Sequence, residues 1–226
     1  MMSTRALSRS VEDYLKAIYG LSGSGDPAST SAIAEALDIQ PASVTGMVKR
    51  MAESGLLEHV PYKGVRLTEP GTLEALRVLR RHRILETYLC ECLGYTWDDV
   101  HDEAERLEHA ASDHLIERMA RALGFPSHDP HGAPIPTRAG DIETADLTTL
   151  AEAEPGDRLL IRAVRDEDSA DLRSMAEGGL VPGARLIVAP GDGTAGSVGI
   201  VLDGREGETR IVPAELARQI YVGTDD

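Results

Sequence analysis

The stretch TSAIAEALDIQPASVTGMVKRMAESGLLEHVPYKGVRLT, residues 30–68, decides the fold of the first third of the chain. Its opening segment, residues 30–37, is a short helical run that begins with hydroxyl side chains, as capped helices do. Residues 38–40 predict a tight turn. Pro41 suits the first turn of a second helix, and Gly55 suits its end. This part therefore predicts two helices joined by a short turn.

Two strands and one further helix complete the pattern. Residues 56–60 and 65–68 read as strands around a Pro-Tyr-Lys-Gly turn. Upstream, residues 9–21 place apolar side chains at i, i+3, i+4, i+7 and i+8, which is one face of a helix. Helix, short helix, turn, helix and hairpin together predict a winged helix-turn-helix. The alternative is a small α+β core without a nucleic-acid role.

The second helix of such a pair enters the major groove of DNA. Its first turn carries small or amide side chains that can approach base edges: Gln40, Ala42, Ser43 and Thr45. Basic side chains suited to phosphate contacts are Lys49, Arg50 and, in the hairpin, Lys63.

The net charge of −15 does not exclude DNA, because the acidity is unevenly spread. Residues 1–70 carry 7 basic and 8 acidic side chains, whereas residues 146–226 carry 8 and 16. A DNA footprint needs a local basic patch rather than a basic chain. No apolar run approaches the roughly 18 residues that a membrane span needs, and Cys90 and Cys92 fit no disulfide or zinc-ribbon spacing. We expect a soluble, cytoplasmic protein without membrane contact.

The middle of the chain predicts two long helices, residues 71–94 and residues 96–124. Their apolar stripes favour packing against each other and against a second copy, so a homodimer is expected. On the second helix, imidazoles and carboxylates recur at i, i+4, i+7 and i+8: His101, Glu105, Glu108 and His109. On the first helix, His82 and Glu86 form another i, i+4 pair.

These side chains are the ligand types of a transition-metal site. The string HDEAERLEH, residues 101–109, lacks the H-E-x-x-H spacing of zinc proteases. The alternative is a solvent-exposed acidic helix face whose histidines have no role as ligands. A metalloenzyme is disfavoured, because the chain shows no nucleophile motif and no glycine-rich phosphate loop.

The last part of the chain predicts a small β domain. Residues 126–146 have the composition of a linker. Five short β-like runs follow, separated by Gly-Asp and Pro-Gly turns as in a small barrel: residues 158–164, 184–188, 197–202, 209–212 and 219–222. The chain is therefore expected to be mainly α with small β parts, in three domains: residues 1–72, 73–145 and 146–226.

Several strings resemble the diphtheria-toxin-repressor family of metal-dependent transcriptional repressors. They are DYLKAIY (13–19), RHRILE (81–86), VHDEAERLEH (100–109), GFP (124–126) and DPHGAPIP (129–136). The resemblance covers residues 9–140 well. It implies a DNA-binding domain, a helical metal-binding and dimerisation domain, and a C-terminal SH3-like β-barrel, as in the longer family members.

The resemblance also implies two metal sites. The primary site takes Asp13, Glu105, Glu108 and His109, and the ancillary site takes His82, Glu86 and His101, with Asp168 and Asp171 from the last domain. Asp13 and Glu105 stand where iron-responsive members carry Met and Cys, which resembles the manganese-responsive branch. Hard carboxylates suit Mn(II), although Fe(II), Co(II) and Zn(II) can bind such ligands in vitro.

One departure concerns Lys16, which stands where the small manganese regulators carry a second acidic ligand, so a binuclear cluster of their kind is not expected. The expected function is a Mn(II)-activated, dimeric repressor that binds operator DNA and controls metal-ion homeostasis genes. The alternatives are an iron-responsive repressor of the same family and a metal-independent winged-helix regulator.

Overall fold

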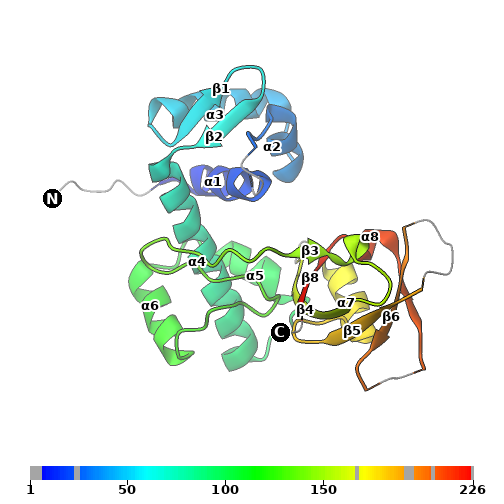
Figure 1. Cartoon of the computed structure of the whole chain (residues 1–226). Helices are drawn as coiled ribbons and strands as arrows, with labels where there is room; N and C mark the ends of the chain where they lie inside the picture. Colours follow the sequence, from blue (N-terminus) through cyan, green and yellow to red (C-terminus); the bar gives the residue numbers. More distant parts are fainter. Residues whose placement is uncertain (1–6, 23–25, 166–167, 191–195, 205–206, 225–226) are drawn as a thin grey trace. The chain divides into compact units, whose positions relative to one another are not determined.

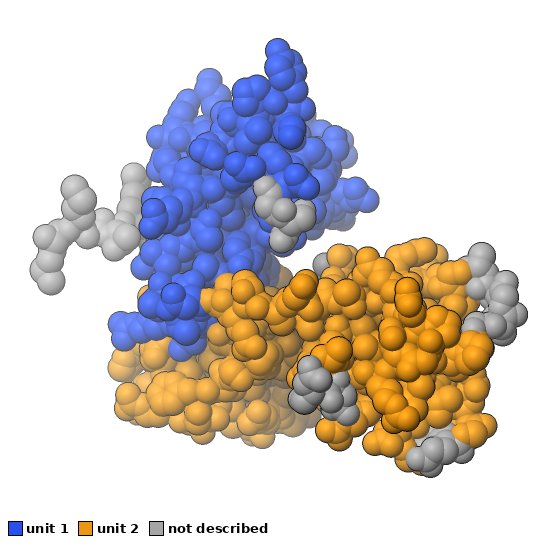
Figure 2. Space-filling model, viewed as in Figure 1, with its two compact units in different colours: residues 1–82, 108–111, 136–141 blue, residues 83–107, 112–135, 142–226 orange. Residues whose placement is uncertain are grey.

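The computed structural model describes residues 7–22, 26–165, 168–190, 196–204 and 207–224. The chain forms two compact units, coloured separately in Figure 2. Unit 1 comprises residues 1–82, 108–111 and 136–141, and unit 2 comprises residues 83–107, 112–135 and 142–226. No helix in the described ranges combines the length and the apolar character that a membrane crossing requires.

Unit 1 begins with three helices, α1 (Arg9–Leu21), α2 (Thr30–Ala36) and α3 (Pro41–Glu53). The bounds of α1 are those that its apolar spacing predicts. The three helices share one core, whose most deeply buried members include Leu15, Ile18, Ile33, Val44 and Met51.

The ends of α2 and α3 are set by local chemistry. Ser29, rather than Thr30, caps α2, and its Oγ accepts from the backbone N–H of Ala32 at 3.1 Å. Asp38 has a φ of 49° in the turn between the helices, a conformation that Asp tolerates better than most residues. Pro41 occupies the first turn of α3, as expected.

The hairpin consists of β1 (Leu57–Val60) and β2 (Gly64–Leu67), which pair antiparallel with Leu57 opposite Leu67. Gly64 has a φ of 128°, and a Cβ built on it would lie 2.1 Å from the carbonyl oxygen of Ala28. Only glycine allows this close approach. The predicted winged helix-turn-helix is confirmed (Figure 1).

Helix α4 (Glu69–Leu93) begins two residues earlier than predicted and ends before Gly94, whose φ is 76°. The prediction of one continuous helix over residues 96–124 is wrong. The chain forms α5 (Val100–Leu107), a turn, and α6 (Asp113–Ala122). Ser112 starts the new helix, because its Oγ accepts from the backbone N–H of Leu115 at 3.3 Å.

The C-terminal part of unit 2 is an antiparallel sheet in the order β3-β8-β4-β5-β6-β7. Its strands are β3 (Thr148–Thr149), β4 (Arg158–Val164), β5 (Arg185–Ala189), β6 (Val198–Leu202), β7 (Arg210–Val212) and β8 (Ile220–Thr224). The expected barrel does not close among the described residues: β3 and β7 remain the two edges. At two and three residues, these edge strands offer too few backbone groups for a closing ladder.

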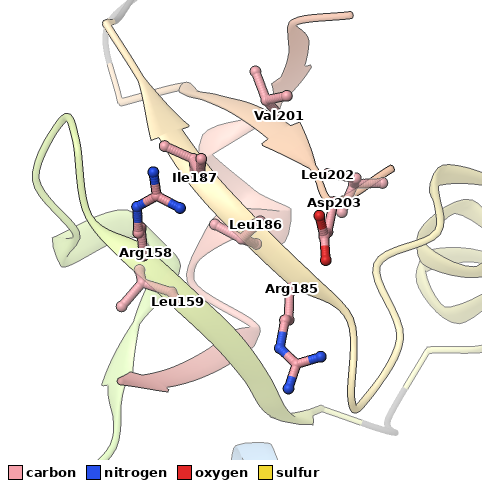
Figure 3. A pocket seen from close by; sticks show the side chains of 8 residues that line it. All are labelled: Arg158, Leu159, Arg185, Leu186, Ile187, Val201, Leu202 and Asp203. Atoms are coloured by element: carbon pink, nitrogen blue, oxygen red, sulfur yellow. The ribbon is translucent and has the colours of Figure 1, made fainter. Parts of the chain in front are cut away.

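Three helical segments accompany the sheet: η1 (Leu150–Glu152), α7 (Ser169–Gly178) and α8 (Ala214–Ala217). The sequence reading did not predict α7, whose Leu172 and Met175 are fully buried in the sheet core. Trp97 packs against the same core. A hollow of about 300 Å³ lies over β4, β5 and β6, with Arg158, Arg185 and Asp203 among its lining side chains (Figure 3).

Candidate metal centre

The first candidate group lies in unit 1 and joins α1 to the turn that follows α5. Ligand atoms of Asp13, Glu108 and His109 all lie within 4.8 Å of one another. Nε2 of His109 is 2.8 Å from Oδ1 of Asp13 and 3.3 Å from Oε1 of Glu108. The turn therefore places Glu108 and His109, two of the ligand types found by their helical spacing, beside Asp13 of the first helix.

Glu12 orients the imidazole of this group. Nδ1 of His109 donates to Oε2 of Glu12 at 2.6 Å, and Arg81 Nη2 donates to Oε1 of Glu12, also at 2.6 Å. Nε2 of His109 is buried and makes no hydrogen bond within the described residues. With its proton on Nδ1, His109 directs the lone pair of Nε2 towards two carboxylates, which is the arrangement a divalent cation fits.

Glu108 is the most deeply buried member of the group, with no exposed side-chain surface. It accepts from His82 Nδ1 at 2.6 Å and from Lys16 Nζ at 3.0 and 3.2 Å. Burial by itself would raise the pKa of Glu108, but the hydrogen bond from His82 and the charge of Lys16 outweigh it and hold this pKa below its ordinary value. Glu108 therefore stays ionised.

A second group of ligand types lies in unit 2, around the fully buried carboxylate of Glu86 on α4. Its Oε1 lies 3.3 Å from Nδ1 of His101 on α5. Nε2 of His101 lies 3.8 Å from Oε1 of Glu105, one turn further along α5. Two predicted ligands of the ancillary site and one of the primary site are thus neighbours within this unit.

The sequence reading missed two residues of unit 2, Asp129 and His131. With Glu86 they form a buried group whose ligand atoms lie within 4.8 Å of one another. His131 Nε2 donates to the carbonyl oxygen of Trp97 at 2.7 Å, so Nδ1 faces Glu86 Oε2 at 3.8 Å. The Asp-Pro-His run that supplies them lies in the segment with linker composition, and a carboxylate two residues from an imidazole there is the signal that could have identified them as metal ligands.

The surroundings of Glu86 are electrically negative. Burial, together with the negative charges of Glu86, Glu91 and Asp129, raises the pKa of the Cys90 thiol to about 11. Arg83 Nε, at 3.4 Å from Asp129 Oδ2, provides partial compensation. Of these causes, the negative charges, but not the burial, also favour a cation.

Asp168 and Asp171 have structural partners within unit 2. Asp168 caps α7, accepting from the backbone N–H groups of Ala170 and Asp171 at 2.7 and 3.1 Å. Asp171 Oδ2 accepts from Gln219 Nε2 at 2.7 Å. Among the described residues, the close groups of metal-ligand types include neither aspartate.

The predicted DNA contacts all lie on exposed positions of α3, of the turn before it and of the hairpin. They are Gln40, Ala42, Ser43, Thr45, Lys49, Arg50 and Lys63. Val44 and Val48 of the same helix are buried in the core, so the predicted contact residues of α3 lie on its exposed side.

Three segments of the chain match known families. Residues 6–65 match "Iron dependent repressor, N-terminal DNA binding domain", residues 68–137 match "Iron dependent repressor, metal binding and dimerisation domain", and residues 148–223 match "FeoA domain". These matches cover the winged helix, the helices that carry the ligand types, and the sheet.

Individual relatives agree with this division. The iron-dependent repressor IdeR of Mycobacterium tuberculosis is 33% identical over 224 residues, which cover 93% of this chain and 95% of that protein. The regulator MntR of Oceanobacillus iheyensis is 38% identical over 116 residues, 51% of this chain and 78% of that one.

Among solved structures, a manganese-dependent transcriptional repressor in complex with manganese has a TM-score of 0.89 at 38% identity, covering 95% of this chain and 99% of that one. Its similarity spans both units. Together with the family matches and the full-length similarity to IdeR, it identifies the chain as a member of the iron-dependent repressor family, the metal-dependent DNA-binding transcriptional repressors.

Proposed function

We propose that this chain is a Mn(II)-activated repressor that binds operator DNA as a homodimer and controls metal-ion homeostasis genes. The observation that carries the proposal is the group formed by Asp13, Glu108 and His109 in unit 1. It ties the first helix of the winged helix-turn-helix to the turn between α5 and α6, so ligand binding there bears directly on the DNA-binding domain.

The donor atoms support manganese. Asp13 and Glu108 offer carboxylate oxygens and His109 an imidazole nitrogen. Glu105, at 3.8 Å from His101, is the further carboxylate that we assign to the primary site. Such hard donors suit Mn(II), and selectivity over metals that bind more strongly must come from geometry and supply. The favoured alternative is Fe(II), because a relative of nearly full length is the iron-dependent repressor IdeR.

The residues of unit 1 explain how a bound ion would act as a switch. Asp13 and Glu108 are anions that repel one another, and a divalent cation supplies the positive charge that holds them together. Glu12 and Arg81 would hold His109 and α1 in place around a bound ion. The two states of the site then bias the position of α1, with a coupling of about 1–3 kcal/mol as is typical of allosteric proteins.

For the ancillary site we propose Glu86 and His101 as ligands, together with His82 one turn earlier on α4, and with Asp168 and Asp171. Asp129 and His131 join this proposal because they share Glu86 within unit 2. Fe(II), Co(II) and Zn(II) are expected to occupy the same donors in vitro.

The surfaces support the two macromolecular partners. The exposed side of α3 and the hairpin residue Lys63 suit a DNA groove and its phosphates. Among the described residues of unit 2, seven large apolar side chains are exposed, and four of these lie between residues 93 and 125, as contact with a second copy would require: Leu93, Tyr95, Leu115 and Phe125. We also propose a cytoplasmic location, where operator DNA is found.

The deciding experiment titrates Mn²⁺, Fe²⁺, Zn²⁺ and a chelator against the chain while binding to its own promoter DNA is followed by fluorescence anisotropy. We expect DNA binding only with metal, and we expect Mn²⁺ at plausible concentrations to favour it. A preference for Fe²⁺ would favour the iron-responsive alternative. Equal binding under chelator would instead favour a metal-independent winged-helix regulator.

A further inference from the structure

Lys16 reaches the same buried carboxylate that the candidate metal group uses. It lies on α1, one turn after Glu12, and its Nζ donates to both oxygens of Glu108 at 3.0 and 3.2 Å. The side chain of Lys16 is 19% exposed, whereas that of Glu108 is fully buried. A long and partly solvated cation thus compensates a buried anion.

Each oxygen of Glu108 already has close neighbours. Oε1 lies 3.0 Å from Lys16 Nζ and 3.3 Å from His109 Nε2. Oε2 accepts from His82 at 2.6 Å and from Lys16 at 3.2 Å. A cation bound by the Asp13, Glu108 and His109 group keeps His109 as a second ligand, so it competes for Glu108 only with the hydrogen bonds from Lys16 and His82.

Lys16 is the neighbour that can move at the lowest cost. His82 and His109 are almost completely buried, and His109 is held by its hydrogen bond to Glu12. Lys16 instead has a flexible four-carbon stem, and its ammonium group is strongly hydrated once it reaches water. The ammonium and an arriving divalent cation carry charge of the same sign, so both cannot occupy Glu108 without repulsion.

We propose that Lys16 is a built-in competitor of the metal: its ammonium neutralises Glu108 in the metal-free chain and leaves it when a divalent cation binds. Lys16 thereby influences the metal concentration at which the site fills. It acts by competing for Glu108 and is not itself a metal ligand. This inference rests on the proposed function and deepens it, by naming the residue that weakens metal binding in exchange for a stable metal-free state.

The test compares Lys16→Met and Lys16→Gln with the wild-type full chain, after removal of metal with a chelator. Isothermal titration calorimetry with Mn²⁺ is expected to give a Kd roughly tenfold lower for both variants, because the competing charge is gone. Thermal unfolding in chelator is expected to give a lower Tm for both, because Glu108 loses a partner. Lys16→Gln is uncharged but retains a hydrogen-bond donor, and it serves if Lys16→Met fails to fold.

Two control variants isolate the charge at this position. Lys16→Arg keeps the charge and is expected to bind Mn²⁺ no more tightly than the wild type. Arg77→Met removes an exposed ion pair with Glu74, 2.6 Å long, from α4 of the same unit and is expected to leave the Kd unchanged.

Two failures are distinguishable. Mn²⁺ affinity that is unchanged or weaker in both uncharged variants overturns the role of Lys16 and leaves the proposed function standing. A wild-type chain that takes up neither Mn²⁺ nor Fe²⁺ overturns both.

Discussion

Nδ1 of His109 lies 2.6 Å from Oε2 of Glu12, so a residue outside the ligand group fixes the imidazole inside it. The other oxygen of Glu12 accepts from Arg81 at 2.6 Å. Two hydrogen bonds, from Arg81 to Glu12 and from His109 to Glu12, therefore link α4, α1 and the turn after α5 within unit 1. Metal ligands of this kind depend on such partners for the orientation and the basicity of the imidazole.

Replacing Glu12 by Gln tests this link. The amide keeps the size of the side chain but loses the charge that holds the Nδ1–H of His109 and Arg81. We expect Mn²⁺ affinity, measured by calorimetry, to fall about tenfold or more. Glu74→Gln, which alters an exposed ion pair of the same unit, is the matched control. Equal affinities for wild type and Glu12→Gln would mean that Glu12 does not orient the site.

Replacing Glu105 by Cys tests the metal preference. A thiolate is a softer donor than a carboxylate, so we expect the variant to respond less selectively to Mn²⁺ relative to Fe²⁺. The measurement is metal-dependent DNA binding by anisotropy, run anaerobically for Fe²⁺. A variant that responds to both metals as the wild type does would refute this account of selectivity.

The thiol of Cys90 reports the field around Glu86. Its pKa of about 11 leaves little thiolate at pH 8, so alkylation is expected to be slow at pH 8 and to accelerate as the pH rises towards 11. Cys92→Ser removes the exposed second cysteine and isolates this signal. Adding Glu86→Gln removes one of the charges that raise the pKa and should shift the rate profile to lower pH. An unshifted profile would show that Glu86 does not act on Cys90.

Replacing either of two glycines of unit 1 by alanine is expected to change the free energy of unfolding, in opposite directions. Gly64→Ala would place Cβ 2.1 Å from the carbonyl oxygen of Ala28 at a φ of 128°, so we expect a loss of roughly 2–4 kcal/mol in the free energy of unfolding. Gly46→Ala, inside α3 with no atom within 4 Å, should instead gain about 0.5–1 kcal/mol. Denaturant unfolding of the metal-free chain measures both. Equal stabilities would contradict the close approach at the hairpin.

Local signals predicted the DNA-binding domain well. Its signals are local ones: the apolar spacing of α1, Pro41 at the start of α3, and Gly55 after the end of α3. Each can be recognised from residues that are close in the sequence. The five main strands of the last domain also fall close to their predicted ranges, because turn residues separate them.

The features that the sequence did not predict correctly depend on contacts between distant residues or on a helix cap inside a predicted helix. Ser112 and Asp113 form a helix-start signal within the stretch predicted as one helix, and the turn before them carries Glu108 and His109. Asp129 and His131 could not be placed beside Glu86 from spacing alone, because Asp129 lies 43 positions after Glu86 in the sequence. Closure of a sheet likewise depends on pairing between distant strands.

Trp97 has a consequence for how this protein can be observed. It is the single tryptophan of the chain, and its ring lies 5.7 Å from that of His131 at an interplanar angle of 24°. All indole emission therefore originates beside the Glu86, Asp129 and His131 group. A paramagnetic ion such as Mn²⁺ bound there would quench it, so the protein carries its own optical probe for unit 2, whereas calorimetry records the heat of binding at both sites together.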